Sequence, residues 1–357
     1  MKGNKKVLKN KLKVISLFSG CGGMDLGFIG NFDFLGKHYM QNPFEIVYAG
    51  DINQKAVETY NHNFSHKAQC INIKEKNFKE LPYADIVIEG FPCQDFSLSG
   101  KRKGFDTERG KLYLQMKKVV NLIKPKIFVA ENVNGLRIPA NGSKKSAMEH
   151  ILEEFKSSGY NVAWKLLNAK NFGVPQDRKR IIIIGIRNDI KTDIMFPEEI
   201  LDETNLVTSK RAIDDLWDKI GNKKIFNHGE KDYSRAKFYK GKKMQGNKKI
   251  EPDKPAPTIR AEHHGNIEGH YRTINKNNPD DVNNWRRLSV RECARLQSFP
   301  DNFVFPCTAT HAYRQVGNAV PPVLAWHIAK NIYEILKNKN ERHINENRKQ
   351  QKRNIIY

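Results

Sequence analysis

The chain has 357 residues, enough to bury a large core and to form two domains or one domain with a large insertion. Its 62 lysine and arginine residues outnumber 39 acidic ones, and the formal charge of +23 favours a polyanionic partner; a simply lysine-rich composition is the alternative explanation. The sequence holds no pattern typical of a signal peptide or a membrane span, and its five scattered cysteines include no Cys-x-x-Cys pair, which argues against a disulfide framework or a bound metal. We therefore expect a cytoplasmic protein.

Short apolar segments alternate with helix-length segments through the first half of the chain. Strands are expected at residues 13–18, 46–49, 84–89, 126–130, 162–167 and 181–184, and helices at 54–64 and 111–123. Apolar strands separated by helices are typical of a parallel sheet that is covered on both faces. The expected fold is therefore α/β, with a doubly wound and mostly parallel sheet.

This regular pattern is lost between about residues 196 and 285. Residues 220–254 hold ten lysines and one arginine against four acids, which indicates a small loop-rich domain or a functional insertion. A capping box formed by Ser289 and Glu292 predicts a helix to Leu296, and a last helix is expected from Pro322 to Leu336. We therefore divide the chain into a main domain at 12–195, a smaller domain at 196–285, a return segment at 286–336 that completes the main domain, and a basic tail at 337–357.

A glycine-rich turn, FSGCGG at 18–23, follows the first expected strand and opens a helix. Glycines let the backbone turn sharply and approach a ligand closely, and the free N–H groups at the start of the helix face that ligand. A tight turn without a ligand is the alternative. The spacing is not that of G-x-G-x-x-G, which disfavours a nucleotide-dependent oxidoreductase.

Charged side chains stand at the ends of three further strands. Asp51 follows the second expected strand, where an acid can accept hydrogen bonds from a ribose diol or simply cap a helix. Glu131 ends the fourth strand. Arg178 and Arg180 precede the isoleucine-rich strand and are expected on one face of it by strand alternation, with a solvated basic turn as the alternative.

The most informative position is Cys93, which follows Gly90-Phe91-Pro92. It stands at the carboxyl end of the strand expected at 84–89, the place where open α/β sheets carry their chemistry. A small buried cysteine is the alternative explanation. Because the carboxyl ends of parallel strands meet at one edge of a sheet, Cys93 and Glu131 are expected near each other.

Taken together and in this order, the motifs resemble those of the DNA (cytosine-5) methyltransferases of prokaryotic restriction-modification systems. The resemblance covers about residues 12–332. The matching blocks are FSGCGG at 18–23, Asp51, GFPCQDFS at 90–97, ENV at 131–133, QDRKR at 176–180, RRLSVRECARLQSFP at 286–300 and QVGNAVPP at 315–322. One departure is Asn72, where the family usually has an aspartate that contacts the adenine amino group. The carbonyl group of Asn72 can still accept that hydrogen bond.

The resemblance implies a Rossmann-like methyltransferase fold that uses S-adenosylmethionine to methylate C5 of a cytosine flipped out of double-stranded DNA. In this family Cys93 would be the covalent nucleophile that adds to cytosine C6. Glu131 would bind the ring N3 and amino group, while Arg178 and Arg180 would contact the carbonyl group. The implied cofactor contacts are Phe18, Gly20, Cys21, Gly22, Gly23, Leu26, Asp51, Ile52, Asn72, Ile73, Pro92, Asn318 and Val320.

The resemblance also assigns the region at 196–285 to the recognition of the DNA sequence. The implied DNA contacts are Ser97, Ser99, Lys101 and Arg260, and no metal is implied. We expect a monomer that is paired in function with a restriction endonuclease but does not touch it.

Two rival functions differ in substrate or in activity. The first is a transfer-RNA cytosine methyltransferase of the same fold; such relatives usually carry Cys-Phe-Thr, which this sequence lacks. The second is a DNA-binding protein without catalytic activity, which would be expected to have lost Cys93 or Glu131. Both residues are present.

Overall fold

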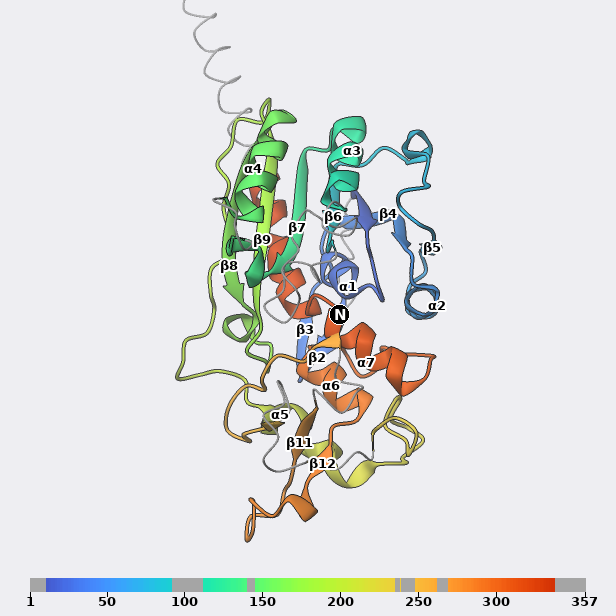
Figure 1. Ribbon diagram of the computed structural model, residues 1–357, viewed down its shortest axis with the longest axis vertical. Coiled ribbons are helices and arrows are strands. Elements are labelled where there is room, and N and C mark those ends of the chain that lie inside the picture. Colours follow the sequence, from blue (N-terminus) through green and yellow to red (C-terminus); the bar gives the residue numbers. More distant parts are fainter. Residues whose placement is uncertain are drawn as a thin grey trace, which may run out of the picture.

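The computed structural model describes residues 11–91, 112–139, 145–234, 238, 248–261 and 269–337. These residues form two lobes, a larger one with a central sheet and a smaller one that lies below it in Figure 1. No helix within the described ranges has the length and apolar character needed to cross a membrane.

The larger lobe is built on a seven-stranded sheet in which the strands follow the order β5-β4-β1-β6-β7-β9-β8. Its five strands from β5 to β7 run parallel, whereas β9 pairs antiparallel with both β7 and β8. This confirms the expected α/β class and mostly parallel sheet. The strands are β1 (Leu12–Leu17), β4 (Phe44–Asp51), β5 (Gln69–Cys70), β6 (Ile86–Glu89), β7 (Ile127–Val133), β8 (Tyr160–Asn168) and β9 (Lys179–Arg187).

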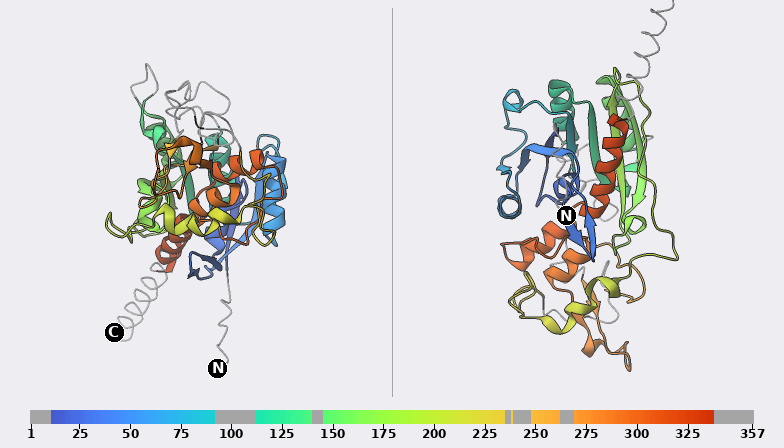
Figure 2. Two further views of the ribbon diagram at one scale, coloured as in Figure 1. Left: turned by 90° about the horizontal axis from the view of Figure 1, so that it is seen from below. Right: turned by 180° about the vertical axis from the view of Figure 1, so that it is seen from behind.

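Helices cover both faces of this sheet (Figures 1 and 2). One face packs against α1 (Gly23–Ile29), α2 (Gln54–Asn63) and a helix over residues 322–337, and the other against α3 (Tyr113–Ile123) and α4 (Ala147–Ser157). Along β9, Ile182 and Ile184 face the first layer while Ile181 and Ile183 face the second, and all four are fully buried. Burying one such side chain stabilises the fold by about 1.5–3 kcal/mol, which explains the unbroken apolar runs.

The sequence analysis did not predict several helices and strands. These are the hairpin of β2 (Phe32–Phe34) and β3 (Lys37–Tyr39), the strand β5, the helix α4, and α7 (Ala309–Asn318), which contacts both α2 and α6. The smaller lobe holds α5 (Ser209–Ile213), α6 (Val290–Leu296) and a three-stranded sheet of β10 (Lys248–Lys249), β11 (His270–Arg272) and β12 (Arg286–Arg287). The short 3-10 helices are η1 (Phe78–Glu80), η3 (Asn134–Arg137), η4 (Ala169–Phe172), η5 (Asp214–Lys219) and η7 (Val282–Asn284).

The predicted capping box at the start of α6 is confirmed. The Ser289 hydroxyl accepts from the Glu292 amide at 3.2 Å, and the Glu292 carboxylate accepts from the Ser289 amide at 2.6 Å. Arg286 adds two hydrogen bonds to the same carboxylate, at 2.6 and 2.9 Å. The start of α6 is thereby tied to β12 in the smaller sheet.

Arg178 joins distant parts of the chain directly before β9 begins. Its Nη1 atom donates to the Ile259 carbonyl at 2.9 Å, and its Nη2 atom donates to the Gly317 and Ala319 carbonyls at 2.8 and 3.0 Å. The side chain is almost completely buried. The expectation that Arg178 and Arg180 act alike from one strand face is therefore corrected, because Arg178 precedes β9 and binds main-chain carbonyls.

We predict that Arg178→Lys destabilises the protein strongly. A lysine keeps the charge, but its single nitrogen cannot replace the two separate nitrogens of Arg178 that reach Ile259 on one side and Gly317 and Ala319 on the other. Buried carbonyls without partners cost about 1–3 kcal/mol each, so the free energy of unfolding should fall by about 3 kcal/mol or more. Urea denaturation measures this loss, and Lys179→Ala at the exposed neighbouring position should change it by less than about 0.5 kcal/mol. An Arg178→Lys variant as stable as that control would contradict the assignment.

Candidate active site

A cavity of about 740 Å³ opens at the carboxyl ends of β1, β4, β6 and β7. The strands of this sheet that come next after β1 in sequence, β4 and β5, lie on one side of it, and the later strands β6 to β9 lie on the other side. The order of the strands therefore reverses between the parallel strands β1 and β6. Open α/β sheets bind ligands at such a point. The predicted residues that line this cavity are Phe18, Gly20, Cys21, Gly23, Asp51, Ile52, Asn72, Glu131, Arg178, Arg180, Asn318 and Val320.

Three predicted cofactor residues stand beside the cavity without lining it. Leu26 and Ile73 pack against the two apolar layers of the core. Gly22 is the N-cap residue of α1 with φ of 91°, and a Cβ atom there would lie 2.4 Å from the Phe64 ring. Gly22 is therefore required by backbone conformation and packing. Pro92 lies outside the described residues, as do Cys93, Ser97, Ser99 and Lys101.

The glycine-rich turn and the return segment form one wall together. A Cβ atom on Gly23 would lie 2.5 Å from the Val320 carbonyl oxygen, so only glycine permits this approach. At Gly20, with φ of 55°, the space around a Cβ position is open. At Gly20 the turn thus leaves its main chain open to the cavity. At Gly23 the same turn contacts Val320, almost 300 positions later in the sequence.

Asp51 is held firmly at the end of β4. Its Oδ2 atom accepts from the Gly20 amide at 2.8 Å, and its Oδ1 atom accepts from the Asn53 amide at 2.8 Å. The cap of α2 is Asn53, whose side chain accepts from the Ala56 amide, so Asp51 does not serve as the helix cap. Burial raises the pKa of Asp51, although hydrogen bonds from main-chain amides oppose the rise.

Glu131 and Arg180 form a close ion pair inside the cavity. The Arg180 Nε atom lies 2.8 Å from Glu131 Oε1, and both side chains are about nine-tenths buried, with 11% and 10% exposed. Burial raises the pKa of Glu131 above its ordinary value, while Arg180 and Arg178 oppose that rise. A carboxyl group in this setting can hold a proton and donate it to a ligand.

The sequence analysis missed several polar lining residues, among them Asn132 and Glu89. Asn132 donates to the Phe91 carbonyl at 3.2 Å and accepts from the Val133 amide at 2.8 Å, which fixes the main chain just before Pro92 and Cys93. Glu89 is the last residue of β6 and is fully buried. Its signal in the sequence was a lone acid that ends an otherwise apolar strand.

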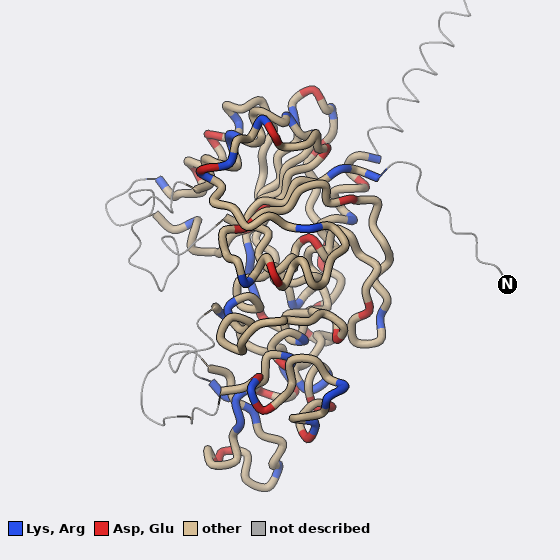
Figure 3. Tube along the Cα trace, turned by 90° about the vertical axis from the view of Figure 1, so that its right-hand side faces the viewer, with Lys and Arg blue, Asp and Glu red and all other residues tan. Residues whose placement is uncertain are grey.

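Arg260 lies in the segment between β10 and β11 and is partly buried. Its main chain packs against Gly317, where a Cβ atom would lie 2.2 Å from the Arg260 carbonyl carbon. Basic residues are spread over both lobes and are interspersed with acids (Figure 3). A contact between Arg260 and DNA stays a prediction.

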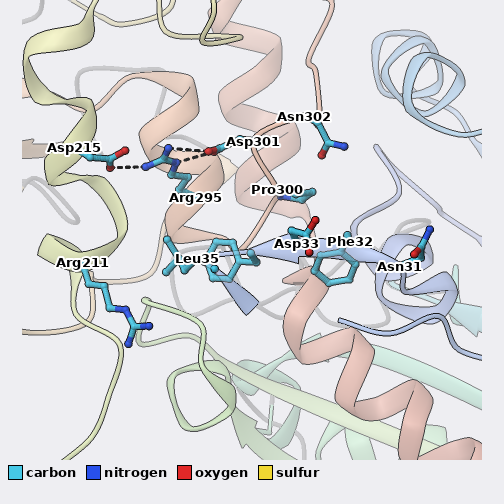
Figure 4. A pocket seen from close by; sticks show the side chains of 12 residues that line it. Asn31, Phe32, Asp33, Leu35, Arg211, Asp215, Arg295, Pro300, Asp301 and Asn302 are labelled. Carbon is cyan, nitrogen blue, oxygen red and sulfur yellow. Dashed lines mark hydrogen bonds and ion pairs between the residues drawn. The ribbon is translucent and has the colours of Figure 1, made fainter. Parts of the chain in front are cut away.

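A second cavity of about 630 Å³ lies between the β2–β3 hairpin and the smaller lobe (Figure 4). Arg295 crosses it between two acids, 2.5 Å from Asp215 and 2.7 Å from Asp301. None of the predicted catalytic or cofactor residues lines this second cavity. We therefore assign the candidate active site to the first cavity, where the predicted residues gather.

Comparison with known proteins gives a family that agrees with this geometry. The model of the C-5 cytosine-specific DNA methylase family matches residues 12–334. The Type II methyltransferase M.NgoFVII of Neisseria gonorrhoeae is 36% identical over 355 residues, which cover 93% of this chain and 89% of the relative. M.FnuDI of Fusobacterium nucleatum is 37% identical over 355 residues, which cover 92% of this chain and 96% of the relative.

Solved structures share the fold. The Dnmt2 methyltransferase of S. pombe matches with a TM-score of 0.67 at 22% identity, covering 91% of this chain and 99% of that protein. The Entamoeba histolytica methyltransferase EhMeth matches with a TM-score of 0.68 at 18% identity, covering 92% and 99%. With the family model matched over nearly all of its length, this chain belongs to the C-5 cytosine-specific DNA methylases.

Proposed function

We propose that this enzyme transfers the methyl group of S-adenosylmethionine to C5 of a cytosine that is flipped out of duplex DNA. The observation that carries the proposal is the buried pair of Glu131 and Arg180, which shares one cavity with Asp51 and the glycine-rich turn. A base-binding pair and a ribose-binding acid in one cavity suit a reaction between a nucleobase and a nucleoside cofactor.

The described residues fit the cofactor. Each oxygen of the Asp51 carboxylate accepts one main-chain N–H and keeps a lone pair for a ribose hydroxyl. Phe18 and the exposed Ile52 give the cavity apolar walls for an adenine ring. When bound, S-adenosylmethionine supplies an electrophilic methyl group on its sulfonium.

The residues of the chain supply what cytosine needs to accept that methyl group. We infer that the Cys93 thiolate adds to C6, and that Glu131 donates its proton to N3 as negative charge develops there. The C5 carbon would then be electron-rich enough to attack the methyl group that the bound cofactor would supply, and N3 would return its proton to Glu131. Loss of the C5 proton to a water molecule and departure of the Cys93 thiolate would then restore the aromatic ring.

Arg180 and Arg178 take different parts in this scheme. Arg180 uses its Nε atom for Glu131 and its Nη1 atom for the Lys179 carbonyl, which leaves Nη2 for the cytosine carbonyl oxygen. Arg178 acts as a positioning residue, because its terminal nitrogens bind main-chain carbonyls. We further propose that the loop-rich region at 196–285 selects the DNA sequence, since contacts with base edges specify and contacts with phosphates position.

The names of the relatives as Type II methyltransferases support a role beside a restriction endonuclease. We propose that the enzyme protects host DNA from such an endonuclease, acts as a monomer without touching it, and works in the cytoplasm. Bisulfite sequencing of DNA from cells that express the chain would identify the sequence that it protects.

We predict that Cys93→Ala abolishes methyl transfer while binding to DNA changes by no more than a few-fold. The thiolate supplies the covalent step, whereas phosphate contacts supply most of the affinity for DNA. Transfer of label from S-adenosylmethionine to DNA measures the first effect, and a filter-binding titration measures the second. Measurable turnover by Cys93→Ala would overturn the proposed mechanism.

The raised pKa of Glu131 predicts how the rate of chemistry depends on pH. The protonated carboxyl is the active form, and because its folded pKa lies above the ordinary value, this form persists to a higher pH than for a free glutamate. The single-turnover rate should therefore fall as pH rises through the folded pKa of Glu131.

Single-turnover measurements on Glu131→Gln provide the check. The amide can still hydrogen-bond N3 but cannot transfer a proton, so the rate should drop by roughly a hundredfold and lose the alkaline decline that Glu131 causes. Glu153→Gln, at a surface carboxyl on α4, is the matched control and should leave the wild-type profile unchanged. The same alkaline decline in Glu131→Gln would contradict the role of Glu131.

A further inference from the structure

Glu89 is a buried acid whose carboxyl group has no hydrogen-bond partner among the described residues. It is 1% exposed and ends β6, between Leu17 of β1 and Ala130 of β7 in the sheet register. Burial alone raises the pKa of Glu89 well above its ordinary value. A buried carboxyl group without a hydrogen bond lowers the stability of the fold, and a bound ligand that donates hydrogen bonds to it would offset that loss.

The Glu89 side chain lines the same cavity as the proposed cofactor and base sites. The other ionisable acidic and basic residues that line this cavity are Asp25, Asp51, Lys74, Glu131, Arg178, Arg180 and Arg314. None of them contributes to the shift in the pKa of Glu89, which has desolvation as its only cause. The cavity therefore contains a carboxyl group that the protein itself leaves without a cationic partner in its described part.

The order of strands tells which part of the cofactor lies near Glu89. Along the carboxyl edge of the sheet stand Asp51 on β4, the turn after β1, Glu89 on β6 and Glu131 on β7. Neighbouring strands are about 4.8 Å apart. If Asp51 binds the ribose and Glu131 the cytosine, the sulfur that joins ribose, methyl and methionine must lie between them, close to the end of β6.

We propose that the Glu89 carboxylate binds the α-ammonium group of the methionine part of S-adenosylmethionine. The proposal rests on the proposed function, because it takes the cofactor and its direction in the cavity from there. The ammonium group offers three N–H donors to a carboxylate that otherwise lacks any.

The ammonium is a better partner for Glu89 than the sulfonium. The sulfonium loses its charge when the methyl group leaves, so a carboxylate beside it would stabilise the ground state over the transition state and slow the reaction. The ammonium keeps its charge throughout. Glu89 thus binds the cofactor before the reaction and the product after it equally well.

The variant Glu89→Gln tests this assignment, since glutamine has the same shape without the ability to ionise. Isothermal titration should show that S-adenosylmethionine and S-adenosylhomocysteine both bind roughly tenfold or more weakly, by the same factor. In buffers of different ionisation enthalpy, the wild type should release up to one more proton on binding than the variant does, because the ammonium lowers the pKa of Glu89. The control Glu153→Gln should match the wild type.

Melting of the ligand-free proteins separates a binding role from a structural one. The folded pKa of Glu89 is raised, so its contribution to stability falls as pH rises from the ordinary glutamate range toward that folded value. At pH 8, ligand-free Glu89→Gln should therefore melt at or above the temperature of the wild type. A lower melting temperature would mean that Glu89 has a partner within the protein, and the proposal would fail.

The remaining outcomes are equally decisive. If Glu89→Gln weakens binding of the sulfonium cofactor but not of the thioether product, Glu89 faces the sulfur and the ammonium assignment is wrong. If the wild type binds the cofactor and methylates DNA while the variant binds both ligands normally, only the role of Glu89 fails. If the wild type binds neither ligand, the proposed function fails and the role of Glu89 fails with it.

Discussion

The guanidinium group of Arg178 donates to three carbonyls that lie 81, 139 and 141 positions away in the sequence. Two of those carbonyls belong to Gly317 and Ala319, which lie in the return segment and line the cavity. The third belongs to Ile259, in the segment between β10 and β11 of the smaller sheet. The cavity wall, the smaller lobe and the base of β9 therefore depend on one buried cation.

Neighbouring contacts strengthen this junction. Gln176 donates to the Leu296 carbonyl at 3.1 Å and accepts from the Ile259 amide at 3.0 Å, and Gln297 donates to the Ala319 carbonyl at 2.5 Å. Each of these bonds involves a main-chain atom, and the Leu296 carbonyl and the Ile259 amide are buried, where they would be costly to leave without a partner. The shape of the cavity wall thus follows from hydrogen-bond satisfaction as much as from apolar packing.

Three acidic side chains along the carboxyl edge of the sheet differ in the groups that surround them. Asp51 accepts from main-chain amides, Glu131 pairs with Arg180, and Glu89 has no partner in the described part of the protein. Burial raises the pKa of all three, but their partners differ. Carboxyl groups in different environments can serve different tasks within one cavity. We assign them to a ribose, to a methionine ammonium and to a cytosine.

The sequence predicted the core of the sheet well because β6, β7 and β9 are buried on both faces and consist of apolar runs. Because β9 is apolar on both faces, its sequence lacks the alternation of polar and apolar residues that is common in antiparallel strands. The sequence therefore did not predict that β9 runs antiparallel to β7 and β8. The β2–β3 hairpin was missed because its strands have three residues each and its turn depends on positive φ at Leu35 and Gly36. The sequence analysis assigned Arg178 and Arg180 the same role because they are two positions apart, as residues on one face of a strand are. That spacing does not show that β9 begins only after Arg178.

The central claim is that catalysis passes through a covalent bond between the Cys93 thiolate and C6 of the target cytosine. The most direct measurement incubates the enzyme and S-adenosylmethionine with duplex DNA in which 5-fluorocytosine replaces cytosine, followed by denaturing electrophoresis and peptide mass spectrometry. Fluorine at C5 cannot leave as a proton does, so the thiolate cannot depart and the adduct should accumulate. The account predicts a complex that survives denaturation, requires the cofactor and maps to Cys93. A preparation that methylates ordinary DNA but forms no such complex would contradict it.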